Sequence, residues 1–181
     1  MISIDDHGVS FGHRALVRHA EQVAGRAAHL ISSKFGVLPQ IHVLLSSRTE
    51  VLADYVHEAK LALLPEADPR EVARQLRWER RGMRGKYGVT ELSHDGVVLA
   101  VNLRKARTTT DINETLTLTH ELVHAYQLRG PSARNEHLAY LRYGFEIEPL
   151  PRRKVRAYEA LMDRREHQAR DAERLASQLF A

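Results

Sequence analysis

Apolar residues recur at helical spacing along most of this chain, and short apolar runs interrupt that pattern in two regions. Continuous runs rich in β-branched residues predict strands, one at 39–45 and a hairpin of 89–92 and 97–103 that turns at Asp95-Gly96. Helical spacing predicts helices at 11–35, 48–64, 69–81, 111–128, 134–143 and 152–180. Gly36, Pro65 and Gly130-Pro131 follow three of these helices as stop signals. We therefore expect an α+β fold with more helix than strand.

The predicted helix at 111–128 differs from the others in its lack of charge. Asp111 is expected to cap it, with Glu114 at the reciprocal position of a capping box. Between Thr115 and Leu128 the only charged residue is Glu121, although Asp, Glu, Lys and Arg make up 28% of the chain. A helix without charge is typical of a buried position. Burying a carboxylate without a partner is costly, so Glu121 requires one.

Two histidines flank Glu121 in the segment HELVH, which runs from His120 to His124. Residues four apart project from one helical face, so both imidazoles can bind one metal ion. The chain has no cysteine, which leaves His, Asp and Glu as ligands and favours Zn²⁺. Glu121 would then act as the general base toward a metal-activated water. The alternative is a buried His–Glu hydrogen-bond cluster without metal, in a chain with 11 histidines.

The stretch THELVHAYQ resembles the active-site helix of the zincin metallopeptidases, and the uncharged residues around both histidines match the longer zincin pattern. The resemblance is specific over 97–140. It implies a compact zincin-like fold in which a strand at the sheet edge precedes the active-site helix and pairs with the substrate backbone. Residues 97–103 (VVLAVNL) take that place, so we expect a peptide or protein substrate to bind along this edge strand.

The HELVH segment does not itself contain a third metal ligand. The stretch AYQLRGPSAR after His124 lacks the Gly and the His of the metzincin pattern. Glu136 in NEHLAY is our first choice, because the gluzincin resemblance implies a glutamate in Glu-x-x-Ala on the next helix. A tight helical hairpin would bring Glu136 level with His124. Tyr140 is expected to stabilise the oxyanion. Alternatives for that role are His137, Arg142, Tyr143, Tyr158 and His167.

A rival third ligand lies in the last predicted helix. The stretch HQARDAERLASQL is similar to the EAxxFAxxLL stretch of the ImmA/IrrE family, whose glutamate binds zinc. Asp171 falls at that position, and Glu166 is the nearby fallback. The same residues also fit an ordinary solvated helix, in which Glu166 pairs with Arg170 at i,i+4.

Composition and charge narrow the expected partners and location. The net charge is +4 and is densest in WERRGMRGK, from Trp78 to Lys86. No nucleic-acid motif accompanies this cluster and most arginines are mixed with acids, so we do not expect nucleic acid as a partner. The N-terminus lacks the features of a secretory signal, and no apolar run approaches the ~20 residues of a membrane span. We expect one cytoplasmic domain over residues 1–181 with no membrane contact.

The expected function is that of a zinc metallopeptidase with one Zn²⁺ per chain. His120, His124 and Glu136 would bind the metal, and Glu121 and Tyr140 would act on the substrate. Two other hypotheses remain open. One is a regulatory metalloprotein resembling ImmA/IrrE that acts on one repressor partner, and the other is a non-enzymatic metal-binding domain.

Overall fold

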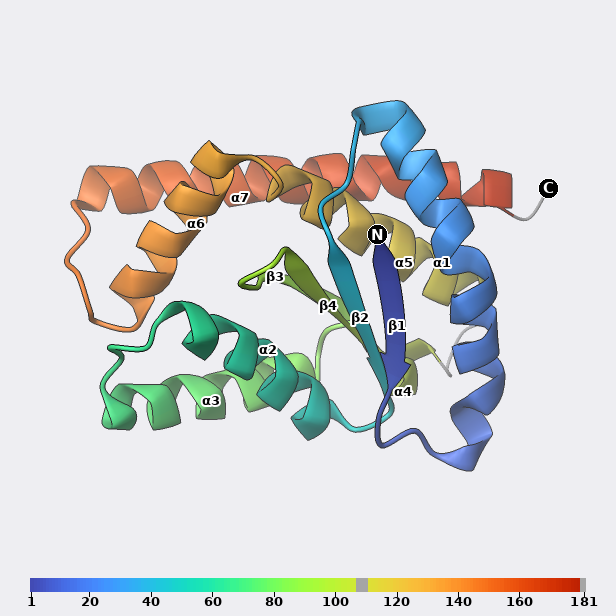
Figure 1. The fold of residues 1–181 in the computed structure, drawn as a ribbon, viewed down its shortest axis with the longest axis horizontal. Helices are drawn as coiled ribbons and strands as arrows, with labels where there is room; N and C mark the ends of the chain where they lie inside the picture. Colours follow the sequence, from blue (N-terminus) through green and yellow to red (C-terminus); the bar gives the residue numbers. More distant parts are fainter. Residues whose placement is uncertain (107–110, 180–181) are drawn as a thin grey trace.

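The computed structural model of the protein describes residues 1–106 and 111–179, in which helices surround one small sheet (Figure 1). The strands are β1 (Ile2–Asp6), β2 (Ile41–Ser46), β3 (Gly88–Leu92) and β4 (Val97–Asn102). The helices are α1 (Arg14–Phe35), α2 (Thr49–Leu63), α3 (Pro69–Met83), α4 (Leu103–Ala106), α5 (Asp111–Gln127), α6 (Pro131–Gly144) and α7 (Arg152–Glu173). Short 3-10 turns precede α1 (Phe11–His13) and follow α7 (Arg174–Leu179). The expected α+β class is confirmed.

The sheet is mixed and has the strand order β1-β2-β4-β3. β1, β2 and β4 run parallel, whereas β3 pairs antiparallel with β4 as the first arm of a hairpin. The predicted hairpin is confirmed, but its reversal is centred on His94 and Asp95. The reason is that the Ser93 N–H donates to the carbonyl of Gly96, which closes the turn one residue earlier than expected.

The expected position of residues 97–103 at the sheet edge is wrong. β4 lies inside the sheet, with β2 paired along one side and β3 along the other. All residues of β4 are buried, and its unbroken apolar run is typical of a strand that is covered on both faces. β1 and β3 are instead the edge strands, and β3 lies beside the HELVH helix α5.

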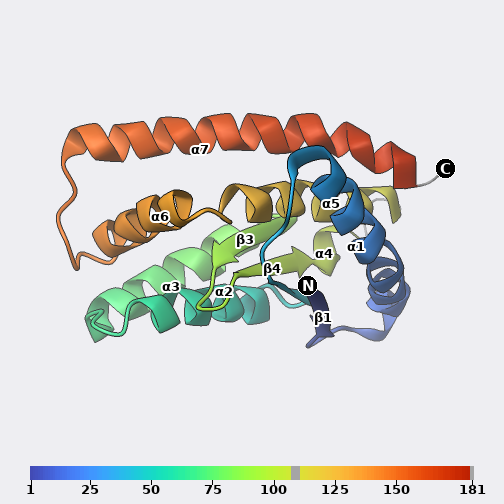
Figure 2. The same cartoon turned by 45° about the horizontal axis from the view of Figure 1, so that its top comes forward.

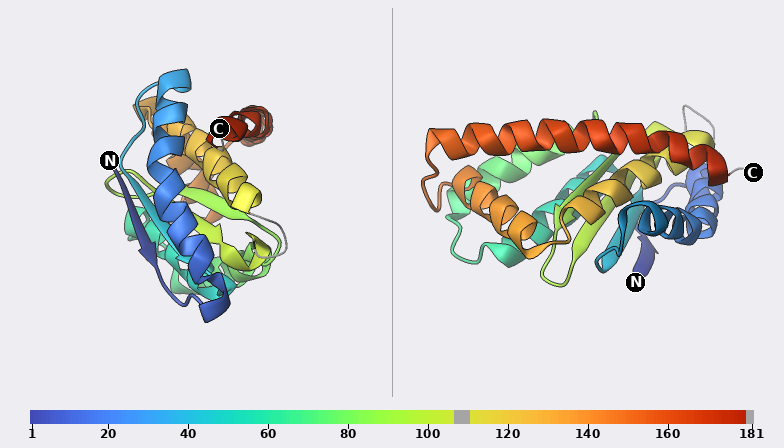
Figure 3. Two further views of the ribbon diagram at one scale, coloured as in Figure 1. Left: turned by 90° about the vertical axis from the view of Figure 1, so that its right-hand side faces the viewer. Right: turned by 90° about the horizontal axis from the view of Figure 1, so that it is seen from above.

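Helices cover both faces of the sheet, with α1 and α5 on one face and α2 and α3 on the other (Figure 3). The side chains of β2 pack alternately against the helices on the two faces. Val43 and Leu45 belong to the main core with α1 and α5, whereas Leu44 packs with α2. α7 lies outside this sandwich and runs along α5, as a turned view shows (Figure 2). The terminal helix therefore packs mainly against the HELVH helix.

The predicted helices are present, but the N-terminal strand β1 was not predicted. Only Ile2 and Ile4 alternate there with exposed polar residues, and two apolar positions are too few to indicate a strand. The pairing of β1 with β2 is a long-range contact that this short pattern does not encode. The side chain of Asp111, expected as a cap, and Phe180, the expected helix end, lie outside the described residues. Within the described chain, no helix has the length and apolar character to cross a membrane.

Candidate metal centre

The two HELVH histidines lie on the outer face of α5, toward α7. Leu118, Leu122 and Ala125 are fully buried and anchor the opposite face of the helix in the main core. His120 and His124 are therefore held side by side, with ring centroids 4.8 Å apart. Their Nε2 atoms lie 3.1 Å from each other. The expected pairing of both imidazoles on one face is confirmed.

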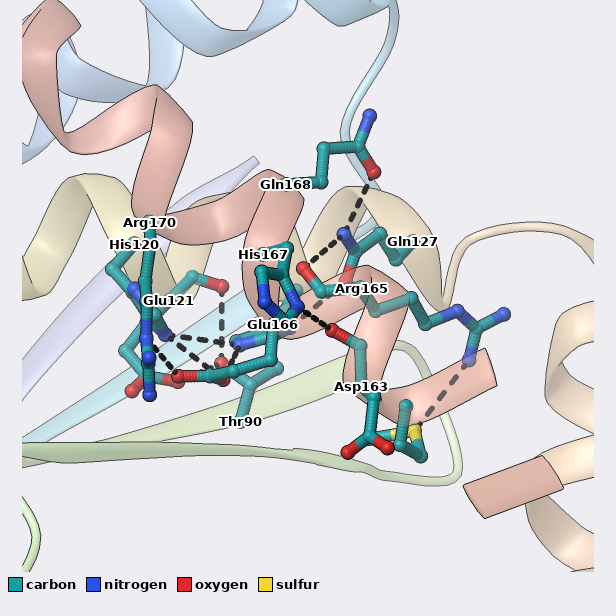
Figure 4. A network of polar contacts seen from close by, with 12 residues as sticks. Thr90, His120, Glu121, Gln127, Asp163, Arg165, Glu166, His167, Gln168 and Arg170 are labelled. Carbon is teal, nitrogen blue, oxygen red and sulfur yellow. Dashed lines mark hydrogen bonds and ion pairs between the residues drawn. The ribbon is translucent and has the colours of Figure 1, made fainter. Parts of the chain in front are cut away.

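The carboxylate that meets the two imidazoles comes from α7 and belongs to Glu166 (Figure 4). Its Oε2 lies 3.5 Å from Nε2 of His120 and 3.3 Å from Nε2 of His124. The other oxygen, Oε1, accepts a hydrogen bond of 3.0 Å from Nε of Arg170. Burial would raise the pKa of Glu166, but the two imidazoles and Arg170 outweigh it and lower the pKa below its ordinary value. Glu166 therefore faces the histidines as a carboxylate.

The second nitrogen of each histidine is fixed by a further side chain. Nδ1 of His120 lies 2.8 Å from Oε1 of Glu173, and Nδ1 of His124 lies 2.8 Å from Oε1 of Gln127. The Gln127 amide is oriented because its Nε2 donates to the carbonyl of Arg165. Both acceptors are oxygens, so in the neutral imidazoles the proton sits on Nδ1 and the lone pair on Nε2.

This arrangement fits a bound cation. Two Nε2 lone pairs and one carboxylate oxygen converge, and such atoms repel one another unless a positive charge lies between them. Zinc binds imidazole nitrogen and carboxylate oxygen at ~2.0–2.2 Å in a tetrahedron, which places its ligand atoms about 3.3–3.5 Å apart. The observed separations of 3.1, 3.3 and 3.5 Å agree with that geometry. His120, His124 and Glu166 are thus the residues that could hold a metal.

Glu121 lies beside this group but points toward the sheet edge. Its side chain is buried, and the Thr90 hydroxyl on β3 lies 2.7 Å from its Oε2 and 3.0 Å from its main-chain carbonyl. Burial raises the pKa of Glu121, and the opposing effects of His124 and the Thr90 hydrogen bond do not cancel it. A carboxylate with a raised pKa is a better proton acceptor near neutral pH.

Gly88 makes room for the Glu121 carboxyl group. A Cβ atom at position 88 would lie 2.7 Å from Cγ and 2.7 Å from Oε1 of Glu121, closer than such atoms approach. The first residue of the edge strand is therefore small because the carboxylate of α5 packs directly against its backbone. The sequence contains this glycine, but nothing in its spacing reveals the contact.

A cleft of about 680 Å³ opens over these residues between the edge strand, α5 and α7. Its floor includes Thr90 and the two histidines, and residues 85–88 form one rim. Lys86, Arg165 and Arg170 bring positive charge to the cleft, against the carboxylates of Glu121, Glu166 and Glu173. The cleft therefore gives a ligand access to the metal group, whose candidate ligands are His120, His124 and Glu166, and to Glu121 beside them.

The structure does not bring Glu136 or Tyr140 to the cleft. Both lie on α6, whose inward face carries His137 and Leu141, one turn apart. Glu136 precedes His137 and is turned outward, where it is exposed. Tyr140 is half-buried and stacks on Tyr158 at 4.3 Å, away from the histidines. The helix after α5 thus does not fold back to the level of His124 as a tight hairpin would.

Three of the other candidate oxyanion donors, His137, Tyr158 and His167, are also engaged elsewhere. His137 reaches the cleft wall, but its Nε2 contacts Glu91 and its Nδ1 contacts the hydroxyl of Tyr158. Burial raises the pKa of Tyr158. His167 lies on the exposed side of α7, where its Nδ1 is 2.6 Å from the carbonyl of Asp163. Asp171 also faces away from the histidines and borders a separate hollow beside Phe35.

The sequence indicates Glu166 only as a fallback ligand, and it does not indicate Thr90, Gly88 or Glu173 as residues of the site. One signal was present on the last helix. Glu166 and Glu173 are seven residues apart and share a helical face, next to the buried alanines 169 and 172. Small residues let two helices approach closely, so acids beside them are directed into the interface with α5. Comparisons of the chain with protein-family models, curated proteins and solved structures find no significant match.

Proposed function

We propose that this chain is a zinc-dependent metallopeptidase in which His120, His124 and Glu166 hold the metal and Glu121 is the general base. The observation that supports the proposal most strongly is the convergence of three ligand atoms at 3.1–3.5 Å beside a buried glutamate. A zinc ion held there would supply Lewis acidity toward a carbonyl and toward water. The resemblance to the zincins agrees with this assignment, with the third ligand on the last helix.

Residues of the chain would carry out the proton transfer and hold the reacting side chains in position. Glu121 accepts the proton of the attacking water and delivers it to the leaving nitrogen of the cleaved peptide bond. Thr90 holds the carboxylate in place through Oε2. Glu173 and Gln127 fix the orientation and the tautomer of the two histidines, which keeps their Nε2 atoms directed at the metal.

The substrate backbone would bind along β3 rather than along β4. β3 is an edge strand, and its residues Gly88, Val89 and Thr90 line the cleft. An extended peptide that pairs with this edge would pass over Glu121 and the two histidines. Pairing with the substrate backbone, which the sequence led us to expect of residues 97–103, is thus assigned to their hairpin partner β3.

A second candidate function is that of a regulatory metalloprotein acting on one repressor, as the ImmA/IrrE resemblance implies. One observation favours it, because the carboxylate that meets the histidines comes from the last helix. That carboxylate belongs to Glu166, while Asp171, which matches the family pattern, lies elsewhere. Cleavage of a single partner at one site, with no cleavage of casein, would support this candidate over a general peptidase.

The first test is the zinc content of the purified protein, measured by mass spectrometry after removal of free metal. We expect about one zinc per chain in the wild type. Glu166→Ala should lose the metal, whereas Glu136→Ala should retain it as a matched removal of an exposed glutamate. Peptide cleavage should follow the zinc content in all three proteins.

Two results would count against the proposal. Loss of zinc in Glu136→Ala with retention in Glu166→Ala would restore the ligand expected from sequence. Absence of zinc from the wild type, even after zinc is supplied, would show that HELVH forms a polar cluster of the helix interface and no metal site.

A further inference from the structure

The exposed side of α3 carries a dense set of cations that lies apart from the metal group. Its members, called here the arginine face, are Arg70, Arg74, Arg77, Trp78, Arg81 and Arg84. At 100° per residue these positions fall within an arc of about 120° on the helix. They span about 21 Å along its axis. All six side chains are exposed, so the face is available to a partner.

The acids near the arginine face in sequence are turned away from it in the structure. Glu79 contacts His57 and Lys60 on α2 instead. Glu71 is buried. Glu71 and Glu146 both form ion pairs with Arg74, which is the one arginine of the face that they contact. The other arginines of the face, Arg70, Arg77, Arg81 and Arg84, form no ion pair with any residue that the structure describes. Among the described residues, the mixing of charges that the sequence indicated is therefore limited on this surface to Arg74.

This surface is unfavourable for the isolated helix. Arg77 and Arg81 are four residues apart and Arg81 and Arg84 three apart, and like charges at these spacings repel. Trp78, the only tryptophan of the chain, is 63% exposed among them, with the Arg81 guanidinium 5.6 Å from its ring. A negatively charged ligand with flat rings would relieve the repulsion and cover the Trp78 ring.

We propose that the arginine face binds single-stranded nucleic acid. Guanidinium groups bind phosphates, and an exposed aromatic ring among them provides a platform for an unstacked base. A protein partner is the less suitable occupant, because the arc contains no Leu, Ile, Val, Phe or Met to form the apolar core of a protein interface. A duplex keeps its bases stacked and would leave Trp78 without a role. The site is independent of the proposed peptidase activity.

The single tryptophan reports binding directly. Titration of the intact protein with an oligothymidylate of about 20 nucleotides should quench Trp78 fluorescence, saturate, and weaken steeply as salt increases. The charge-reversal variant Arg77→Glu/Arg81→Glu should bind at least 10-fold more weakly. Arg152→Glu/Arg153→Glu, at the exposed start of α7, makes the same charge change and should bind as the wild type does.

A labelled oligonucleotide allows Trp78→Ala to be tested by anisotropy, where we expect weaker binding with an unchanged salt slope. Circular dichroism of each variant establishes that the protein keeps its helix content. No binding at low salt, or equal loss in both charge-reversal variants, would overturn the proposal. Tighter binding of polyglutamate than of the oligonucleotide would also overturn it and identify the face as a site for acidic protein segments.

Discussion

The protein contains two clusters of histidine and glutamate. They differ in whether a positively charged side chain lies between the carboxylates. In the cleft, His120, His124 and Glu166 direct three ligand atoms toward one point. In the interior, the side chains of α2, α3, β3 and α6 form a chain of contacts: His57 with Glu79, Lys60 with Glu79 and Glu91, and Glu91 with His137. Among the described residues, only the first cluster satisfies the geometry of a metal site.

Lys60 explains the difference. Its ammonium lies 2.8 Å from Glu79 and 3.3 Å from Glu91, so the interior carboxylates already share a cation. Among the described residues, none places a cation between the ligand atoms of the cleft cluster, and this cluster lines an open cleft. The same residue types thus form a stabilising ion network in one place and a candidate metal centre in the other. The comparison shows that composition alone does not identify a metal site.

We expect the largest difference between variants of the two clusters in their effect on catalysis. Glu121→Gln removes the proposed proton acceptor but none of the proposed metal ligands, so peptide hydrolysis should fall by about 10²–10⁴-fold while zinc content stays unchanged. Initial rates and metal analysis on the same preparation would measure both. Glu91→Gln, in the interior network, should keep most of the hydrolysis when it is assayed below its unfolding midpoint. Equal losses in the two variants would contradict the division of roles.

The next effect is on stability. Glu91→Gln leaves the buried His137 without its carboxylate and Lys60 with Glu79 alone, so the free energy of unfolding should fall by about 3 kcal/mol. Urea denaturation followed by circular dichroism would measure this change. Glu136→Gln on α6 should change the free energy of unfolding by less than ~0.5 kcal/mol, because its side chain is exposed.

The pH dependence of that stability has a definite sign. Burial would raise the pKa of Glu91, but His137 and Lys60 outweigh it and lower the pKa from 4.5 to about 2. A lowered pKa means that the contribution of Glu91 is complete above pH ~4.5 and is lost as the pH falls toward ~2. The wild type should therefore lose stability more steeply than Glu91→Gln over that range. Parallel curves would show that folding does not lower the pKa of Glu91.

The smallest expected effect concerns the support of the metal ligands. Glu173→Ala removes the oxygen that accepts from Nδ1 of His120, so zinc affinity should fall by about 10–100-fold without loss of the site. Glu173→Gln keeps an acceptor oxygen and should fall less. Competition with a chromogenic chelator would rank both against Glu159→Ala, an exposed glutamate of α7 that serves as the control. Unchanged affinity in Glu173→Ala would limit this residue to a surface contact.

The sequence determined the features that depend on spacing within one element. His120 and His124 share a face because four residues make about one helical turn, and the lack of charge around Glu121 predicted the burial of α5 correctly. The helices and the hairpin follow from apolar periodicity and turn residues, which are also local. The short strand β1 carries too weak a pattern to be predicted in this way.

Only the tertiary structure decided which distant residues meet these elements. The proposed third ligand depends on how α7 packs along α5, where the small residues Ala169 and Ala172 allow the two helices to approach closely and Glu166 faces the histidines. β4 lies inside the sheet because β2 pairs along one of its sides and β3 along the other, which leaves β3 at the edge. Contacts between elements result from packing and strand pairing over the whole chain, and no local pattern encodes them.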